Sequence, residues 1–283
     1  MTNTIKELAA SALDRAVRLA ARTAVGRHVF EAALSAAMNR TWVVSHHGVE
    51  LTFAVPNRLN RFRVNTLSTK EPETLEWIDS IARDAVLWDI GANVGLYSCY
   101  AAKARGCRVF AFEPSVFNLE LLARNVFLNQ LTAGVTIVPV PLADNLGTST
   151  LNMTSREWGG AMSTFGQSYG QDGRALQKVF EVRTIGVSMA DAVERLGIPR
   201  PDYIKMDVDG IEHLILKGGA AVLRQVRGVL IEINDEFETQ AVDSTRYLTG
   251  AGLALKAKRH AEMFENSAYR NSYNQIWDRP SAP

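Results

Sequence analysis

The stretch of residues 86–95, VLWDIGANVG, constrains the fold of this chain more than any other. An apolar run rich in strand-forming residues ends at Asp89, and a helical pattern begins at Leu96. Gly91 and Gly95 flank the polar turn between them, and glycines let a backbone curl tightly and approach a ligand closely. The free N–H groups and positive dipole end of the helix would face that ligand. Residues 86–95 therefore predict a strand, a turn and a helix around a nucleotide-like ligand.

Strand and helix patterns alternate along most of the remaining chain. Segments of this length in this order predict right-handed crossovers between parallel strands, with helices on both faces of the sheet. The expected fold class is therefore α/β, with a doubly wound, mostly parallel sheet. The segments 253–259 and 275–277 are expected to close this sheet as a late hairpin. The parallel strands are expected at residues 86–90, 107–112, 135–140, 203–207 and 229–233.

Residues 1–65 are expected to form a helical extension that ends in a small hairpin. Apolar residues recur at helical spacing over 5–24, with Gly26 as the expected stop, and a second helix is expected over 29–39. One interpretation of the first helix is packing on the main domain or on a second copy in a homo-oligomer. The other interpretation is peripheral membrane contact, which its arginine-bearing face suits.

The hairpin is expected over residues 42–55, with His46 and His47 near its turn. Neighbouring residues on a strand point to opposite faces. The two histidines are therefore expected to lie in a solvated turn and not to bind a metal together.

The main domain is expected over residues 66–283, with a lid-like loop at about 154–174. This loop carries five glycines and three aromatic residues without a sustained period. An irregular segment of this kind is typical of a lid or a binding loop. Trp158, Phe165 and Tyr169 are the side chains with which it would cover a bound molecule.

Composition limits the classes of partner and compartment. Among 283 residues, 31 Lys and Arg nearly balance 30 Asp and Glu, so no global field would recruit a nucleic acid. Cys99 and Cys107 are too few for a disulfide scaffold and lack the spacing of metal ligands. No apolar run is long enough to span a bilayer. We therefore expect a cytoplasmic protein without a transmembrane segment.

Polar side chains stand at the ends of four predicted strands, at Asp89, Glu113, Asp207 and Asn234. The carboxyl ends of parallel strands share one edge of a sheet, and ligands of open sheets bind in the crevice there. The sequence therefore predicts one crevice that these side chains surround.

The nearest competing interpretation of the glycine turn is a nicotinamide site, whose fingerprint is G-x-G-x-x-G. Gly91 fits the first position, but Asn93 and Leu96 replace the other two glycines. A P-loop fails as well, because no Gly-Lys-Ser/Thr triplet follows. Glu113 can accept hydrogen bonds from both hydroxyls of a ribose, as in dinucleotide sites, so it does not distinguish between nucleotide cofactors. Asp89 favours a cofactor with an ammonium group, because its charge would repel a pyrophosphate.

With these residues the chain resembles the class I S-adenosylmethionine-dependent methyltransferases and, more narrowly, the FkbM family. The resemblance implies a seven-stranded Rossmann-like methyltransferase sheet and S-adenosylmethionine as cofactor. It also implies transfer of a methyl group to a hydroxyl of a sugar, a glycolipid or a secondary metabolite. Four motifs at consistent spacing carry it, at residues 89–95, 112–114, 204–212 and 216–219.

The resemblance also assigns residues to the cofactor by position. The ribose would bind Glu113, and the adenine edge would lie at Ala143 and Asp144. The family more often has Glu where this chain has Asp209. The methionine part would contact Asp89, Gly91, Asn93 and Gly95.

Methyl transfer from a sulfonium depends mainly on positioning and on exclusion of water. An alcohol acceptor also needs its proton removed. Asp207, Glu212 and His213 are the candidates for this catalytic role, because they lie nearest the end of one predicted strand. Alternatively, Glu212 would bind backbone N–H groups of the first helical turn, and His213 would be a plain surface or packing residue.

A second mechanism would use a divalent ion such as Mg²⁺. Asp207 with Asn234 or Asp235, at neighbouring strand ends, would offer the oxygen ligands that magnesium takes. A third ligand is not evident, so this mechanism is not favoured.

Two functions of different classes follow from these observations. The first is an S-adenosylmethionine-dependent O-methyltransferase. The alternative is a non-catalytic nucleotide-binding or scaffold protein whose N-terminal helix recruits partners. Transfer of a labelled methyl group to a small-molecule or glycan acceptor distinguishes the two.

Overall fold

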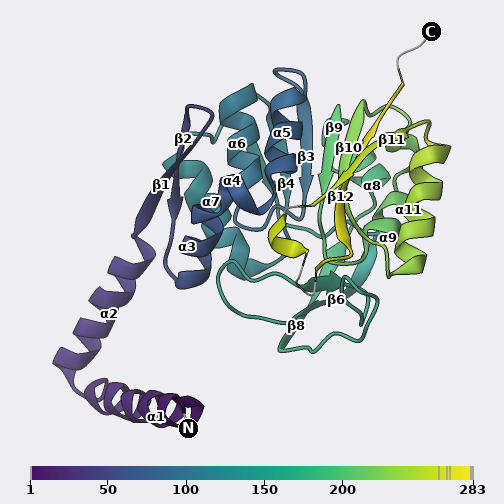
Figure 1. Cartoon of the computed structure of the whole chain (residues 1–283). Coiled ribbons are helices and arrows are strands. Elements are labelled where there is room, and N and C mark those ends of the chain that lie inside the picture. The colour runs from purple at the N-terminus through teal and green to yellow at the C-terminus, as the bar shows by residue number, and fades with distance from the viewer. Residues whose placement is uncertain (1, 261, 266, 268, 281–283) are drawn as a thin grey trace.

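The computed structural model describes residues 2–260, 262–265, 267 and 269–280. Its centre is a seven-stranded sheet in the order β11-β12-β10-β9-β3-β4-β5 (Figure 1). The strands from β10 to β5 in this order run parallel, and β12 runs antiparallel to β10 and β11. The predicted mostly parallel α/β sheet is thereby confirmed. The strands are β3 (Val86–Ile90), β4 (Arg108–Phe112), β5 (Val135–Val138), β9 (Tyr203–Met206), β10 (Gly228–Asn234), β11 (Ala254–Arg259) and β12 (Ser272–Asp278).

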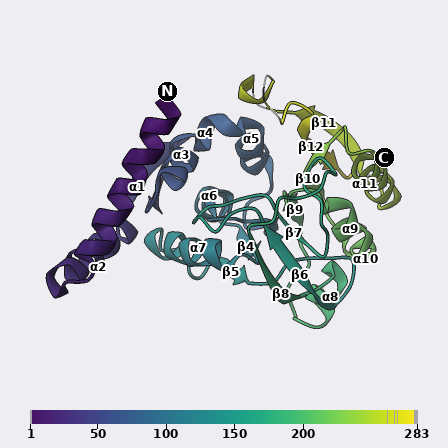
Figure 2. The same ribbon diagram turned by 90° about the horizontal axis from the view of Figure 1, so that it is seen from below.

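Helices cover both faces of this sheet (Figure 1, Figure 2). Successive side chains of β3 point to opposite faces, so Leu87 packs with Tyr100 in one core and Trp88 packs with Ile215 in another. A strand that is apolar on both faces stays buried only when helices cover each side. The first face carries α5 (Pro72–Ser80), α6 (Leu96–Arg105) and α7 (Val116–Leu128), and the second carries α8 (Met189–Glu194), α9 (Glu212–Lys217), α10 (Ala220–Leu223) and α11 (Glu238–Gly250).

The predicted late hairpin is confirmed as β11 and β12. β12 lies between β10 and β11, so the last strand is inserted into the sheet and not added at its edge. Its register places Ser272 opposite Asn234, at the carboxyl end of β10. The insertion therefore brings a C-terminal segment, including a short 3₁₀ helix (Glu262–Phe264), to the edge where a ligand is expected.

The N-terminal extension contains α1 (Thr2–Ala20) and α2 (Ala24–Met38), which project away from the sheet (Figure 1). The prediction that Gly26 stops the first helix is wrong. That helix ends at Ala20, and Thr23 caps the second helix by accepting a hydrogen bond from Gly26 N at 2.9 Å. A Cβ at Gly26 would lie 1.9 Å from the Ala20 backbone oxygen, so the glycine permits the tight junction between the helices. None of the helices described is long and apolar enough to cross a membrane.

The predicted hairpin is confirmed as β1 (Thr41–His46) and β2 (Val49–Ala54). The backbone N–H groups of Thr52 and Ala54 donate to the side-chain oxygens of Asn129 and Asn125 at 2.9 and 2.7 Å. These bonds hold the hairpin against the C-terminal half of α7. Two short helices, α3 (Arg58–Asn65) and α4 (Leu67–Lys70), then lead into α5.

A second, three-stranded sheet in the order β7-β6-β8 lies at the carboxyl ends of the parallel strands (Figure 1, Figure 2). Its middle strand precedes the lid-like loop that is expected over residues 154–174, and β7 is a short strand inside that loop. The loop therefore starts from this second sheet, at the edge of the main sheet where the predicted crevice lies. The strands are β6 (Gly147–Met153), β7 (Ser163–Phe165) and β8 (Phe180–Gly186).

Candidate functional site

The turn after β3 brings two neighbouring strand ends into contact. Gly91 has φ 82°, and a Cβ there would lie 1.8 Å from the Asp207 backbone oxygen. Gly95 precedes α6 with φ 80°, and a Cβ there would lie 2.3 Å from Leu122 Cδ1. Conformation and space therefore both exclude larger residues at the two glycines. The predicted strand, turn and helix are confirmed.

Asn93, with φ 51°, lies at the centre of this turn and helps to hold Glu113. The backbone N–H groups of Asn93 and Ser115 donate to the two carboxylate oxygens of Glu113 at 2.8 and 2.7 Å. Burial raises the pKa of Glu113 to about 7, although these hydrogen bonds oppose the shift. The carboxylate is thus fixed just beyond β4, where the hydroxyls of a ribose could donate to it.

A strap, residues 157–163 of the lid-like loop, lies across the turn. The side-chain amides of Asn93 and Asn118 both donate to the Gly160 backbone oxygen, at 2.9 and 3.0 Å. Asn118 Oδ1 in turn accepts the N–H group of Gly159 at 3.0 Å. Polar side chains from the turn and from α7 therefore hold the strap against the site.

Asp209 holds the other end of the strap. Its Oδ2 accepts the N–H groups of Met162 and Ser163 at 2.7 and 3.1 Å. Burial and the nearby charge of Asp207 raise the pKa of Asp209 to about 6. The observed role of this carboxylate is to position the strap.

Two cavities meet beneath the strap. A smaller one of about 50 Å³ lies beside Glu113 and Phe165. A larger one of about 440 Å³ extends toward α3, α4 and the segment before β12. The junction therefore consists of the glycine turn, the strap and the end of β9, because both cavities are lined by Gly91, Asn93, Ala161, Asp207 and Asp209.

Lys205, which is not among the predicted site residues, joins the two strand-end aspartates. Its Nζ lies 3.5 Å from Asp89 Oδ1, 3.7 Å from Asp207 Oδ2 and 5.3 Å from the ring centre of Tyr97. Burial alone would lower the pKa of Lys205, but Asp89, Asp207 and Glu71 raise it above its ordinary value. The ammonium therefore stays charged. A lysine inside the apolar strand YIKM is the sequence signal that could have found it.

The two aspartates differ in exposure. Asp89 is 1% exposed and accepts a hydrogen bond from Ser98 Oγ at 2.5 Å, so it lies behind the cavity wall. The Asp207 side chain is 30% exposed and lines both cavities. The predicted contact between Asp89 and the methionine ammonium stays a prediction, and the observed partner of Asp89 is Lys205.

The other two predicted catalytic residues, Glu212 and His213, line neither cavity. Glu212 accepts the N–H groups of Val208 and Gly210 at 3.0 and 3.1 Å and a hydrogen bond from Gln240, and burial raises its pKa to about 7. His213 is buried, and its ring packs edge-on against Phe237. Both side chains therefore take the alternative roles considered for them, loop support and packing.

Ala143 and Asp144, the predicted adenine contacts, lie next to the smaller cavity. Residues 140–142 line this cavity, whereas Asp144 pairs with Lys217 at 3.1 Å. The motif at residues 216–219 explains their position. A Cβ at Gly218 would lie 2.7 Å from the Asp144 backbone oxygen, so the glycine lets the end of α9 pack directly on this segment.

The ligands considered for magnesium are engaged elsewhere. Asn234 Oδ1 accepts the N–H group of Glu236 at 2.9 Å, and Asp235 pairs with Lys258. Neither residue lines the two cavities with Asp207. The geometry therefore gives no support to a magnesium ion held between these strand ends.

The wall of the larger cavity contains charged residues that are not among the predicted site residues. Lys70 pairs with Glu71, which also accepts a hydrogen bond from Tyr97 at 3.0 Å. Glu232 enters from β10, and burial together with nearby acidic groups raises its pKa well above the usual range. The glutamate within the apolar run of β10 is a sequence signal for a crevice residue. No such signal marks Lys70 and Glu71, which precede Pro72.

The three aromatic residues of the lid-like loop do not gather on the larger cavity. Phe165 lines the smaller cavity, Trp158 packs beside α7, and Tyr169 faces Phe237 edge-on with ring centres 5.3 Å apart. Their apolar surface is mostly used within the fold. The loop therefore contributes to the site mainly through the backbone of the strap.

The chain is similar to known methyltransferases. Over 215 residues the chain is 26% identical to the hexuronic acid methyltransferase AglP of Haloferax volcanii, covering 74% of this chain and 80% of the relative. It is 27% identical to the methyltransferase sdnD of Sordaria araneosa, covering 50% and 62%. The solved FkbM methyltransferase of Methylobacillus flagellatus is 14% identical, with a TM-score of 0.49 over 90% of this chain and 59% of that one. The model of the methyltransferase FkbM domain matches residues 89–265, and the chain therefore belongs to the FkbM family of methyltransferases.

Proposed function

We propose that this methyltransferase takes its methyl group from S-adenosylmethionine and transfers it to a hydroxyl of a sugar, a glycolipid or a secondary metabolite. The observation that carries the proposal is the junction of the two cavities. There the fixed carboxylate of Glu113 lies on one side, Asp207 lies at the meeting point, and about 440 Å³ of space opens beyond it.

The smaller cavity is the proposed place of the adenosine part of the cofactor. Glu113 would accept the ribose hydroxyls, and Phe165 and residues 140–142 would contact the base. Gly91 and Asn93 would contact the methionine part, because both residues line the junction. The cavity is small in this structure because the strap lies against the turn, so we expect the strap to move when the cofactor enters.

Asp207 is the proposed catalytic residue. The sulfonium is already an activated leaving group, so the protein has to align the acceptor oxygen, exclude water and take up the hydroxyl proton. Asp207 lines both cavities, and Lys205 at 3.7 Å fixes its orientation. S-adenosylmethionine would supply the methyl group and leave as neutral S-adenosylhomocysteine when its S–CH3 bond breaks, and the Asp207 carboxylate would accept the proton of the acceptor hydroxyl.

The larger cavity is the proposed acceptor site. Its volume of about 440 Å³ falls within the range of roughly 300–1,000 Å³ that is usual for small-molecule sites. Its wall presents side chains of both charges, including Arg63, Lys70 and Glu71. Such a lining suits an acceptor with many hydroxyl groups, and the similarity to a hexuronic acid methyltransferase supports a sugar.

The direct test is methyl transfer from labelled S-adenosylmethionine to a panel of neutral sugars, hexuronic acids and glycolipids. We expect product with a sugar or sugar acid, and a fall in turnover of about 10²–10⁴-fold in Asp207→Asn. Asp235→Asn is the matched control, because Asp235 follows the neighbouring strand and pairs with Lys258 outside the cavities. Cofactor binding without transfer to any member of the panel would favour the non-catalytic alternative.

A further inference from the structure

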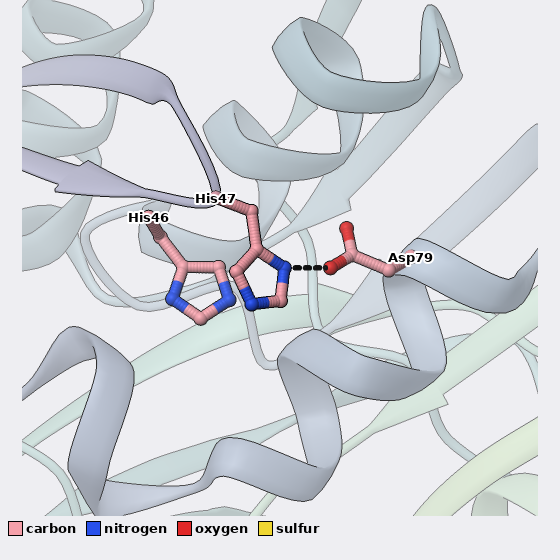
Figure 3. Close-up of side chains that lie close together, drawn as sticks. All are labelled: His46, His47 and Asp79. Atoms are coloured by element: carbon pink, nitrogen blue, oxygen red, sulfur yellow. Dashed lines mark hydrogen bonds and ion pairs between the residues drawn. The ribbon is translucent and has the colours of Figure 1, made fainter.

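A cluster of metal-ligating side chains lies away from the two cavities, where the tip of the β1–β2 hairpin meets α5. His46, His47 and Asp79 each offer one ligand atom, and these atoms all lie within 4.8 Å of one another. Figure 3 shows the two imidazole rings side by side, with the Asp79 carboxylate bonded to the outer edge of the second ring. We propose that this cluster binds a divalent transition metal ion, with Zn²⁺ as the best fit.

The turn brings the two histidines together, which corrects the expectation of opposite faces. His47 has φ 45° and Gly48 has φ 79°, the left-handed pair that a two-residue hairpin turn requires. Side chains therefore stop alternating between the two faces of the hairpin at His46. The two ring centres lie 4.1 Å apart.

His46 presents an unused ligand atom to the cluster. Its Nδ1 lies 2.9 Å from Ser68 Oγ, whereas its Nε2 is buried and has no hydrogen-bond partner in the part of the chain that the structure describes. With Nδ1–H donating to Ser68, Nε2 carries the lone pair that a metal takes.

Asp79 is held in a similar way and also contacts His47. Asp79 Oδ2 lies 2.7 Å from His47 Nδ1, and Asp79 Oδ1 accepts a hydrogen bond from Tyr100 OH at 2.7 Å. Metal sites commonly fix each ligand by a hydrogen bond from behind, as Ser68 and Tyr100 would do here. Both supports come from α4 and α6, outside the hairpin.

The donor set selects the kind of metal. Two imidazole nitrogens and one carboxylate oxygen are typical of zinc, whereas magnesium prefers oxygen ligands alone. Tetrahedral zinc with bonds of about 2.0–2.1 Å would need ligand atoms about 3.3 Å apart. His47 is 66% exposed, so its ring can rotate to close that distance, and a water would fill the open fourth position.

A metal here would fasten the hairpin to α5 and, through Ser68, to α4. Lys70 in the same short helix lines the larger cavity. The ion would therefore stabilise one wall of the proposed acceptor site without touching the reacting atoms. The proposal does not depend on the identity of the cofactor or the acceptor.

The test is a calorimetric titration of the untagged, chelator-treated full chain with ZnCl₂. We expect one site per chain with a dissociation constant in the micromolar range or below, and a higher melting temperature when zinc is present. Loss of the site in His47→Ala, with at least about tenfold weaker binding in Asp79→Asn and Ser68→Ala, would support the proposal. His28→Ala, which removes an exposed histidine of α2, is the matched control and should bind as the parent does.

X-ray absorption of the zinc-loaded protein gives a second readout, which does not depend on how the variants fold. Two imidazole nitrogens and further oxygen ligands at about 2.0–2.1 Å are expected. The proposal is overturned if zinc fails to bind at micromolar concentrations. It is also overturned if binding survives unchanged in His47→Ala, or if the absorption spectrum lacks imidazole.

Discussion

The carboxyl ends of β3 and β9 share one local pattern, an aspartate at the end of a mostly apolar strand with a glycine-containing turn after it, yet the two aspartates have different surroundings. Asp89 is covered by α6 and bonded to Ser98, while Asp207 opens onto two cavities. Lys205 stands between them. The sequence pattern therefore determines where each carboxylate lies. The segments that pack over the strand end determine whether that carboxylate stabilises the fold or contacts a ligand.

The largest expected effect separates the two aspartates by activity. Asp207→Asn should lower turnover by about 10²–10⁴-fold and change cofactor affinity less than about threefold, because it removes a proton acceptor and keeps the shape. Steady-state kinetics and calorimetry measure the two quantities. Unchanged turnover in Asp207→Asn would contradict the catalytic role that we assign to Asp207 and not to Asp89.

The second expected effect is on the free energy of unfolding, in which the two aspartates should also differ. Lys205→Met should lower the free energy of unfolding by about 3–5 kcal/mol, because it leaves the buried carboxylate of Asp89 without its ion-pair partner. Asp207→Asn should cost less than about 1 kcal/mol, because its carboxylate is partly exposed. Urea unfolding followed by circular dichroism gives both values. The double variant Asp89→Asn/Lys205→Met should recover most of the loss, and no recovery would argue against this pairing.

The third effect is a pH dependence that comes from Glu113 at the end of β4. Its folded pKa of about 7 lies above the ordinary value of 4.5, so the folded chain holds more protons than the unfolded chain between these pH values. This group therefore stabilises the ligand-free protein most below about pH 4.5, and the contribution is lost as the pH rises through 7. Glu212, with a pKa raised to about 7, acts in the same direction.

Cofactor binding should follow the opposite trend, because the ribose hydroxyls need the ionised carboxylate. Affinity for S-adenosylmethionine should fall about tenfold from pH 8 to pH 6. In Glu113→Gln the affinity should be lower and almost independent of pH. Calorimetry at both values measures this, and an unchanged pH profile in the variant would assign the dependence to another group.

The smallest expected effect concerns the strap. Asp209→Ala removes the acceptor of the Met162 and Ser163 N–H groups and should cost about 1–2 kcal/mol or less. Hydrogen exchange at these two amides should become at least about tenfold faster, while exchange in β3 stays unchanged. Asp209→Asn retains an acceptor oxygen and is the matched control. Equal exchange in the parent and in Asp209→Ala would mean that Asp209 does not hold the strap.

The sheet and the glycine turn could be predicted because each depends on a local signal. Buried parallel strands are apolar on both faces, and Gly91 and Gly95 occupy positive φ angles that glycine favours. The strand-end position of Asp207 followed from the same pattern. These features need no knowledge of what packs above them.

The rest depends on contacts between segments far apart in the sequence. Lys70 and Glu71 reach the larger cavity because α3 and α4 fold back over the glycine turn, and no local pattern marks them. Glu212 and His213 stand beside Asp207 in the sequence but lie in the layer behind it. The prediction that His46 and His47 point to opposite faces also failed, because His47 is a left-handed turn residue that follows the last residue of the strand.

The central claim is that S-adenosylmethionine lies across the ends of β3 and β4 with its sulfur facing Asp207. A crystal structure with bound S-adenosylhomocysteine tests it most directly. We predict ribose hydroxyls within about 2.6–3.2 Å of the Glu113 carboxylate and the sulfur at the junction of the two cavities. A nucleoside bound elsewhere, or a sulfur that points away from Asp207 and the larger cavity, would contradict the account.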